Sequence, residues 1–216
     1  MNGFKIGRMV LGVCQTNCYF IYKEGATAAN GLCPALVVDP ADQGEQIYES
    51  LTRKGFAVQG ILLTHGHVDH ILGVKALQEL SGARVYACEQ ERDVLQDMEL
   101  NLSAMFNLPC KVTADVLLKD GEVCTVAGMT FRMIATPGHT EGSCCYYFEE
   151  GSLLISGDTL FEGSVGRTDF PTGSMSVLIR SMKQKLFALP EKTIVYPGHG
   201  GSTTIGWEKD NNPFVI

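Results

Sequence analysis

The sequence has no run of lysine or arginine, and its charge balance is acidic. Its 216 residues carry 17 Lys and Arg against 24 Asp and Glu, a formal net charge of −7. A protein that binds nucleic acid needs a basic surface to neutralise phosphates, so the composition predicts no nucleic-acid partner. An anionic small-molecule substrate is not excluded, because a metal site supplies its own local positive charge.

Long apolar runs are absent as well. No stretch approaches the roughly 20 apolar residues that cross a bilayer, so the sequence predicts no membrane partner. The first residues, MNGFKIGRMVLGV, lack the long apolar core and small-residue cleavage site of a signal peptide. We therefore expect a cytoplasmic protein.

None of the cysteines forms a C-x-x-C pair. The eight are Cys14, Cys18, Cys33, Cys88, Cys110, Cys124, Cys144 and Cys145. A secreted disulfide framework is usually denser and shorter, so we expect free, mostly buried thiols in a reducing compartment. Cys144 and Cys145 are adjacent on a predicted strand, where successive side chains point to opposite faces. We expect one of them to be buried and the other exposed.

The sequence also lacks internal repeats, low-complexity tracts and linkers. Its 45% hydrophobic and 19% charged residues are ordinary for a globular protein, and its length allows a sizeable core. We expect one domain over residues 1–216.

Strand-like and helix-like segments alternate in the first half. Apolar patterns predict strands over residues 4–10, 18–23, 35–38, 58–63 and 84–88. Helical spacing predicts helices over residues 43–54 and 69–80, and a broken helix over 89–108. This alternation is typical of layered α/β folds.

In the second half, Asp-Gly, Ala-Gly and Glu-Gly dipeptides separate short strand-like runs, as in hairpins. These runs predict strands over residues 122–126, 129–135, 144–148, 153–156 and 193–196, with a helix over 174–186. Because each half contributes strands and helices, we predict two sheets packed face to face with helices outside, a four-layer αββα sandwich.

Histidine is scarce, and every histidine lies in a motif suited to metal binding. The motifs are T-H-G-H-V-D-H, T-P-G-H-T and Y-P-G-H-G, and S-G-D-T-L adds an aspartate. Together they give seven candidate metal ligands: His65, His67, Asp69, His70, His139, Asp158 and His199. Alone, His139, Asp158 or His199 is more typical of an ordinary loop, but the H-x-H-x-D-H cluster favours metal for all of them.

Each group of candidate ligands lies just beyond the end of a predicted apolar strand. Buried strands form a rigid base, and the loops at their ends can converge on one site. Imidazole and carboxylate ligands suit zinc best, and also iron or manganese. Seven ligands are enough for two divalent ions that share one carboxylate, with a spacing of about 3.5–4 Å.

These residues resemble the metallo-β-lactamase superfamily, in the same order and over nearly the whole chain. The resemblance implies the αββα metallo-β-lactamase fold and a binuclear metal centre. It implies that His65, His67 and His139 bind the first metal, that Asp69, His70 and His199 bind the second, and that Asp158 bridges them.

Within the superfamily, the sequence looks most like a short bacterial subgroup of the glyoxalase II-like hydrolases. The resemblance rests on G-D-T-L-F at 157–161, G-R-T-D-F at 166–170 and N-P-F at 212–214. Diiron flavoproteins usually carry Glu in place of His67, and true β-lactamases usually lack a bridge such as Asp158. The RNA-processing members have extra domains.

Full-length glyoxalase II enzymes have a helical C-terminal domain that helps to bind glutathione, which this sequence does not show. The resemblance therefore implies thioester hydrolysis more strongly than it implies glutathione as the carrier.

The expected reaction is hydrolysis of a small-molecule thioester such as S-lactoylglutathione. A hydroxide that bridges the two metals is the expected nucleophile, and Asp69 is expected to orient it or take its proton. One alternative is a persulfide dioxygenase with a single iron on His65, His139 and Asp158. Another is a non-catalytic metal-binding module, although a closed structural zinc site needs only four ligands.

Three further features have two interpretations each. Arg167 either meets a substrate carboxylate or forms a local ion pair with Asp169. Met105 and Phe106 either face the substrate from a flap or belong to the core. The hydroxyls beside His139, those of Thr140 and Ser143, either orient ligands or cap a turn.

Overall fold

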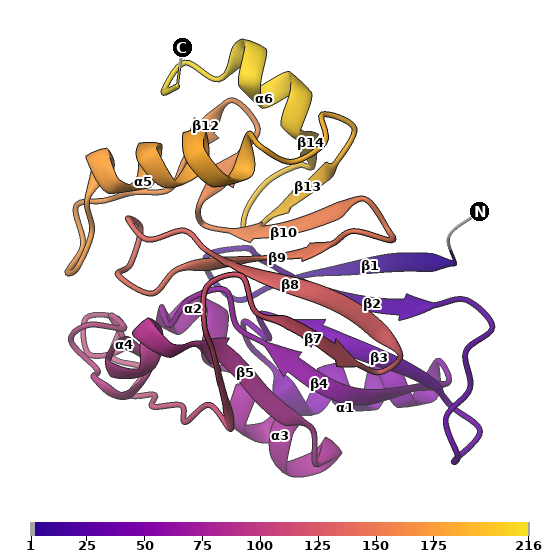
Figure 1. Cartoon of the computed structure of the whole chain (residues 1–216). Coiled ribbons are helices and arrows are strands. Elements are labelled where there is room, and N and C mark those ends of the chain that lie inside the picture. Colours follow the sequence, from indigo (N-terminus) through magenta and orange to yellow (C-terminus); the bar gives the residue numbers. More distant parts are fainter. Residues whose placement is uncertain (1–2, 216) are drawn as a thin grey trace.

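The computed structural model describes residues 3–215 and contains two six-stranded sheets (Figure 1). The first sheet follows chain order: β1 (Phe4–Leu11), β2 (Thr16–Lys23), β3 (Cys33–Val38), β4 (Phe56–Leu62), β5 (Arg84–Cys88) and β6 (Val116–Leu118). Strands β1 to β3 pair antiparallel, and β3 to β6 pair parallel. Parallel neighbours require crossover connections, and all three of these connections contain helices.

The second sheet is built from the second half of the chain. Its order is β14 (Thr203–Thr204), β13 (Ile194–Pro197), β10 (Leu153–Gly157), β9 (Cys144–Phe148), β8 (Met129–Ala135) and β7 (Val123–Val126). Only β10 and β13 pair parallel; the other pairs described for this sheet are antiparallel. A small hairpin of β11 (Leu160–Phe161) and β12 (Ser164–Val165) follows β10.

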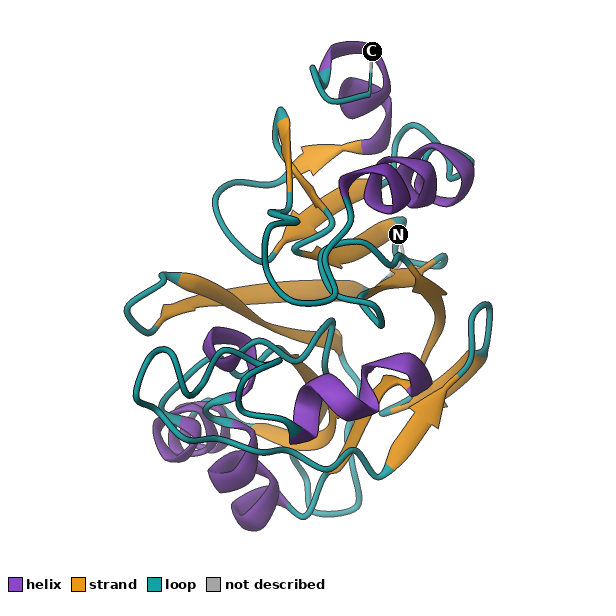
Figure 2. Ribbon diagram, turned by 90° about the vertical axis from the view of Figure 1, so that its left-hand side faces the viewer, coloured by secondary structure: helices purple, strands orange, loops and turns teal. Residues whose placement is uncertain are grey.

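Helices cover the outer face of each sheet, which completes four layers (Figures 1 and 2). Helices α1 (Gly44–Arg53) and α3 (Val74–Ser81) pack on the first sheet, and α5 (Met175–Ser181) with η2 (Met182–Leu186) on the second. Buried side chains form three clusters, one between the sheets and one beneath each helical layer. The predicted αββα sandwich is confirmed.

The helix predicted over 69–80 is two helices, α2 (Val68–Ile71) and α3. The chain bends at Gly73, whose N–H donates to the Pro40 carbonyl at 2.8 Å. A side chain at Gly73 would place its Cβ 2.7 Å from that oxygen, so this close approach requires glycine. The bend allows α2 to turn its candidate ligands toward the second sheet.

The segment predicted as a broken helix over 89–108 is helical only at its start. It contains η1 (Glu89–Glu91) and α4 (Arg92–Gln96), and then turns. The sequence also did not predict four short strands or the last helix. The missed elements are β6, β11, β12, β14 and α6 (Ile205–Asn211).

The expectation of one buried and one exposed cysteine on β9 is wrong, because both are buried. Their side chains do point to opposite faces: Cys144 joins the cluster between the sheets, and Cys145 joins the cluster beneath α5. Both faces of this sheet are covered, so alternation along the strand does not lead to exposure. All eight cysteines are free, and four of them are buried.

No helix among residues 3–215 is long and apolar enough to cross a membrane.

Candidate metal centre

The candidate ligands come together where the two sheets meet at one edge. His65 and the residues after it follow β4 in the first sheet. The other candidate ligands follow β8, β10 and β13 in the second sheet: His139, Asp158 and His199. The strands fix the positions of these loops, because the core between the sheets is closely packed around them.

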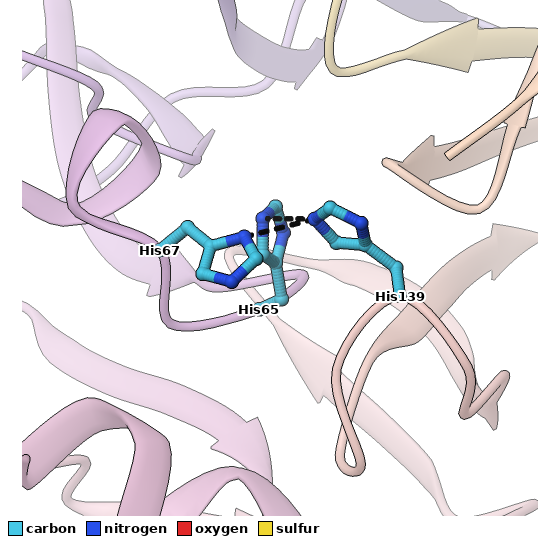
Figure 3. Close-up of side chains that lie close together, drawn as sticks. All are labelled: His65, His67 and His139. Atoms are coloured by element: carbon cyan, nitrogen blue, oxygen red, sulfur yellow. Dashed lines mark hydrogen bonds between the residues drawn. The ribbon is translucent and has the colours of Figure 1, made fainter. Parts of the chain in front are cut away.

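Three imidazoles point toward one another from two separate loops (Figure 3). His139 Nε2 lies 2.9 Å from His67 Nδ1 and 3.2 Å from His65 Nε2. All three rings are nearly inaccessible to solvent. Three nitrogens that converge in this way can offer their lone pairs to one cation.

Asp69, His70 and His199 form a second group beside the first. Asp69 Oδ2 lies 3.6 Å from His70 Nε2 and 3.4 Å from His199 Nε2. Ligand atoms of each of these groups lie within 4.8 Å of one another, as do those of His65, His70 and Asp158.

Asp158 lies between the two groups. Its Oδ1 is 3.4 Å from His70 Nε2, and its Oδ2 is 3.5 Å from His199 Nε2 and 3.7 Å from His139 Nε2. One carboxylate therefore faces both groups, which is the arrangement expected of a bridging ligand.

The chemistry of this cluster fits divalent metal ions. Nitrogen and oxygen ligands at about 2.0–2.2 Å in a tetrahedron stand ~3.4 Å apart, close to the separations seen here. Three buried atoms of the cluster, His67 Nε2, His70 Nε2 and Asp158 Oδ1, have no hydrogen-bond partner. Buried polar atoms are rarely left without a partner, so bound cations account for His70 Nε2 and Asp158 Oδ1 better than a purely structural role does. His67 approaches the cluster through Nδ1, so a bound cation does not account for its Nε2.

Comparison with known proteins agrees with this geometry. A sequence model of the Metallo-beta-lactamase superfamily matches residues 11–199. The chain belongs to this superfamily. It therefore carries the His/Asp metal-binding cluster that is typical of the superfamily.

Two curated relatives of the chain are named as hydrolases. The chain is 36% identical to the probable metallo-hydrolase YqgX of Bacillus subtilis, with 96% of each chain covered. It is 32% identical to the hydroxyacylglutathione hydrolase GloC of Haemophilus influenzae, with 93% of each covered. These relatives and the superfamily match support an enzyme.

Solved structures of different activities share the fold. BLEG-1 B3 metallo-beta-lactamase is 38% identical, with a TM-score of 0.89 over 98% of this chain and 99% of that one. TTHA1623 in a di-iron-bound form is 33% identical, with a TM-score of 0.82 over 96% and 99%. ETHE1 from Myxococcus xanthus is 29% identical, with a TM-score of 0.77 over 97% and 83%. The superfamily fold is therefore clear, while these comparisons leave the specific activity open.

Electrostatics shift the pKa values of four of the histidines, two downward and two upward. Burial, followed by repulsion from neighbouring imidazoles, holds the pKa of His65 well below its ordinary value. Burial and His139 lower the pKa of His67 to about 3. These rings are neutral at physiological pH, the form that binds a metal ion.

The pKa values of His70 and His199 are shifted in the opposite direction. Burial opposes protonation of these two rings, but the negative charges of Asp69 and Asp158 outweigh burial. They raise the pKa of His70 well above its ordinary value and the pKa of His199 to about 9. The two carboxylates have pKa values below their ordinary range, that of Asp69 at about 2, because His70 and His199 outweigh the effect of burial. The carboxylates therefore stay ionised, and a bound cation can take the place of the protons on His70 and His199.

Asp39 orients His70, a role that sequence reasoning missed. Asp39 Oδ2 lies 3.0 Å from His70 Nδ1 and accepts the Thr64 hydroxyl at 2.6 Å, while its Oδ1 accepts the Thr64 N–H at 2.8 Å. A carboxylate on Nδ1 fixes the ring and leaves Nε2 for a metal. In the sequence, Asp39 only follows the strand predicted over residues 35–38; its burial, which calls for a polar partner, is visible only in the structure.

Glu91 is the second residue that sequence reasoning missed. It is fully buried and accepts the N–H of Gly66 at 2.7 Å, the N–H of Gly142 at 2.9 Å and the hydroxyl of Thr140. Burial raises the pKa of Glu91 to about 7, against the lowering effect of these donors. Gly66 lies between His65 and His67, so Glu91 ties their loop to the loop that carries His139. Thr140 and Ser143 also share a hydrogen bond, at 2.6 Å, within the second loop.

A cavity of about 330 Å³ opens in front of the candidate ligands; we call it the metal cavity. Phe106 and Arg167 line it, but Met105 is not among its lining residues. Met105 is 62% exposed and Phe106 is 41% exposed, so the alternative that they belong to the core is wrong.

Arg167 forms the anticipated ion pair: Nη2 lies 2.7 Å from Asp169 Oδ2, with both side chains exposed.

Proposed function

We propose that the protein hydrolyses thioesters with two divalent metal ions, zinc being the best match, as a glyoxalase II-like enzyme. The observation that carries the proposal is Asp158, whose two oxygens face both groups of candidate ligands. In this proposal, His65, His67 and His139 hold one ion, and Asp69, His70 and His199 hold the other. Residues 1–216 act as a single domain in a reducing cytoplasm, which suits eight free cysteines.

When bound, such ions lower the pKa of water enough to supply hydroxide near neutral pH, and they polarise a carbonyl. The reaction adds water across the thioester: the C–S bond breaks, a C–O bond forms, and a carboxylic acid and a thiol are released. No nucleophile from the protein is needed, so the cysteines are not required for the chemistry.

Asp69 has the position to orient the attacking water or accept its proton. It lines the metal cavity, and its Oδ2 accepts the Thr16 hydroxyl at 2.9 Å and lies 3.4 Å from His199 Nε2. These contacts restrain the carboxylate while part of it remains accessible. Orientation of this kind contributes to the rate because the water is held before it reacts.

The carrier side of the substrate lies toward Arg167 in this proposal. Arg167 lines the metal cavity and its guanidinium stands 4.2 Å from the centre of the Phe170 ring. Its side chain is 64% exposed despite the ion pair with Asp169, so donors remain for an anionic carrier such as glutathione. Hydroxyacylglutathione hydrolase GloC, at 32% identity, supports this substrate class.

The second candidate function is that of a persulfide dioxygenase with one iron on His65, His139 and Asp158. Similarity to ETHE1 and the 3.7 Å approach of His139 Nε2 to Asp158 Oδ2 favour it. That reaction uses neither Asp69 nor His199 as a ligand, although both converge on the same cavity. Hydrolysis with two metal ions accounts for all seven candidate ligands.

The test is to purify the protein without added metal, determine its metals by elemental analysis, and assay several substrates in parallel. S-lactoylglutathione tests thioester hydrolysis, and a glutathione persulfide assayed with an oxygen electrode tests the dioxygenase. Thioester turnover by protein with two metals per chain supports the proposal. Oxygen consumption without thioester turnover supports the dioxygenase, and a fully metal-loaded protein that cleaves no thioester overturns the proposed function.

A further inference from the structure

A second cavity, of about 240 Å³, adjoins the metal cavity. We call it the apolar pocket. It lies between the β1–β2 turn, the loop after β3, helix α2 and the segment after α4. Its lining residues are Gly12, Val13, Cys14, Ala41, Asp42, Val68, Asp69, Leu72, Phe106 and Leu108.

The apolar pocket is continuous with the metal cavity. Three residues, Cys14, Asp69 and Phe106, line both. A ligand whose reacting carbon lies beside Asp69 can therefore extend one substituent into the apolar pocket and the other along the metal cavity. A thioester carbonyl has two such substituents, the acyl chain and the sulfur with its carrier.

Charge decides which substituent enters the apolar pocket. The lining contains no lysine, arginine or histidine, and its two ionisable acids are Asp42 and Asp69. An anionic carrier has no basic side chain to meet there and is repelled by the carboxylate of Asp42, which is not among the candidate metal ligands. Arg167 lines only the metal cavity, so the carrier belongs on that side.

The exposed apolar side chains at the mouth of the pocket agree with a function in binding. Val13 is 86% exposed, Phe106 41% and Leu108 39%, and they come from segments more than 90 residues apart in the sequence. Apolar residues gathered at a concave site, rather than scattered singly, are typical of a surface that covers a ligand.

We propose that the apolar pocket holds the acyl group of the substrate, and that this group is an unbranched aliphatic chain longer than acetyl. The inference rests on the proposed thioester hydrolysis and narrows its substrate class. A polar, short acyl group such as lactoyl leaves most of the pocket filled by water. An aliphatic chain displaces that water, and each buried methylene improves binding.

The experiment compares kcat/KM for acetyl-, butanoyl-, hexanoyl- and lactoylglutathione with the metal-loaded protein. We expect kcat/KM to rise by about two- to fourfold for each added methylene. Leu108→Trp fills the pocket from its exposed rim and is expected to lower the hexanoyl-to-acetyl ratio by about tenfold. Leu80→Trp is the matched control, because Leu80 is similarly exposed at 47% but lies on α3 outside the pocket.

Two results overturn the inference while leaving thioester hydrolysis intact. One is a kcat/KM that does not rise with chain length. The other is a hexanoyl-to-acetyl ratio in Leu108→Trp that equals the ratio in Leu80→Trp. Either result places the acyl chain outside the apolar pocket.

A calorimetric titration separates failure of this inference from failure of the proposed function. If no thioester is cleaved, the proposed function fails, and hexanoate and acetate are titrated into the same protein. Tighter binding of hexanoate that is lost in Leu108→Trp and kept in Leu80→Trp still supports an aliphatic pocket. Equal binding of hexanoate and acetate overturns it.

Discussion

Thr140 donates its hydroxyl to both carboxylate oxygens of Glu91, at 2.9 Å each, in a part of the protein that solvent does not reach. The same carboxylate accepts the N–H of Gly66 from the loop of His65 and His67. A single buried side chain therefore sets the separation of two loops that carry candidate ligands. Outer contacts of this kind commonly affect metal affinity as much as they affect stability.

We expect Glu91→Gln to weaken metal binding by about 10- to 100-fold. A glutamine offers one oxygen where three donors now meet a carboxylate, so at least one N–H of Gly66 or Gly142 loses its acceptor. Metal affinity, measured by competition with a chelator, tests this expectation. Glu89→Gln on the same short helix is the control, and equal affinities in the two variants would show that Glu91 has no effect on the metal site.

Asp158→Ala should retain the fold and lose turnover by more than the roughly 100-fold that loss of an outer contact causes. Its carboxylate faces both groups of candidate ligands, so its removal leaves the charge of bound cations poorly compensated. Circular dichroism and steady-state kinetics are measured side by side. Asp120→Ala serves as the control. It also removes a paired aspartate, since Asp120 forms an ion pair with Lys185. Near-normal turnover in Asp158→Ala would refute the bridging role.

Arg167→Ala should raise KM for glutathione thioesters with little change in kcat. Contacts made equally in the ground state and the transition state affect KM alone, and the carrier is remote from the reacting bond. Asp169→Ala releases the guanidinium from its ion pair and should leave KM unchanged or lower it. If both variants show the same kinetic defect, Arg167 acts only through its pair with Asp169.

Metal affinity should increase as the pH rises toward 9. In the metal-free protein, Asp69 and Asp158 raise the pKa of His199 to about 9 against the effect of burial, so a proton occupies this ring at neutral pH. A metal ion must displace that proton. In the metal-free protein, the protonated form contributes stability that is complete below pH 6.5 and is lost as the pH rises through 9.

Calorimetric titration of zinc at several pH values, in buffers of different ionisation enthalpy, measures the protons released. His199→Ala is the matched variant, because it removes the ring that carries the proton. A zinc affinity that is the same at pH 6.5 and pH 9, or a proton release that is unchanged in His199→Ala, would contradict the expectation.

The αββα architecture could be predicted because its local signals were strong. Turn dipeptides such as Ala127-Gly128 separated the strands of the second sheet, and apolar periodicity marked α1 and α3. The short elements gave no such signal. Strands β11, β12 and β14 contain two residues each and depend on tertiary pairing rather than on periodicity.

Asp39 and Glu91 show why part of the site could not be predicted. Glu91 follows Glu89 in a polar segment, and acidic residues there are usually exposed. Its burial results from donors 25 to 51 residues away along the chain. The predicted exposure of one of Cys144 and Cys145 is wrong for the same reason. Strand alternation predicts which face of the sheet a side chain takes, but only the packing of α5 decides whether that face is covered.

The sequence by itself determined the identity of the seven candidate ligands and the strands that precede them, because histidine motifs and apolar strands are local patterns. Only the tertiary structure decided how the ligands group, since packing of the two sheets brings His139 Nε2 to 2.9 Å from His67 Nδ1 across 72 residues. The same packing produced the Glu91 contacts and the apolar pocket. Contacts between residues distant in sequence depend on how whole layers fit together, and no local pattern encodes that fit.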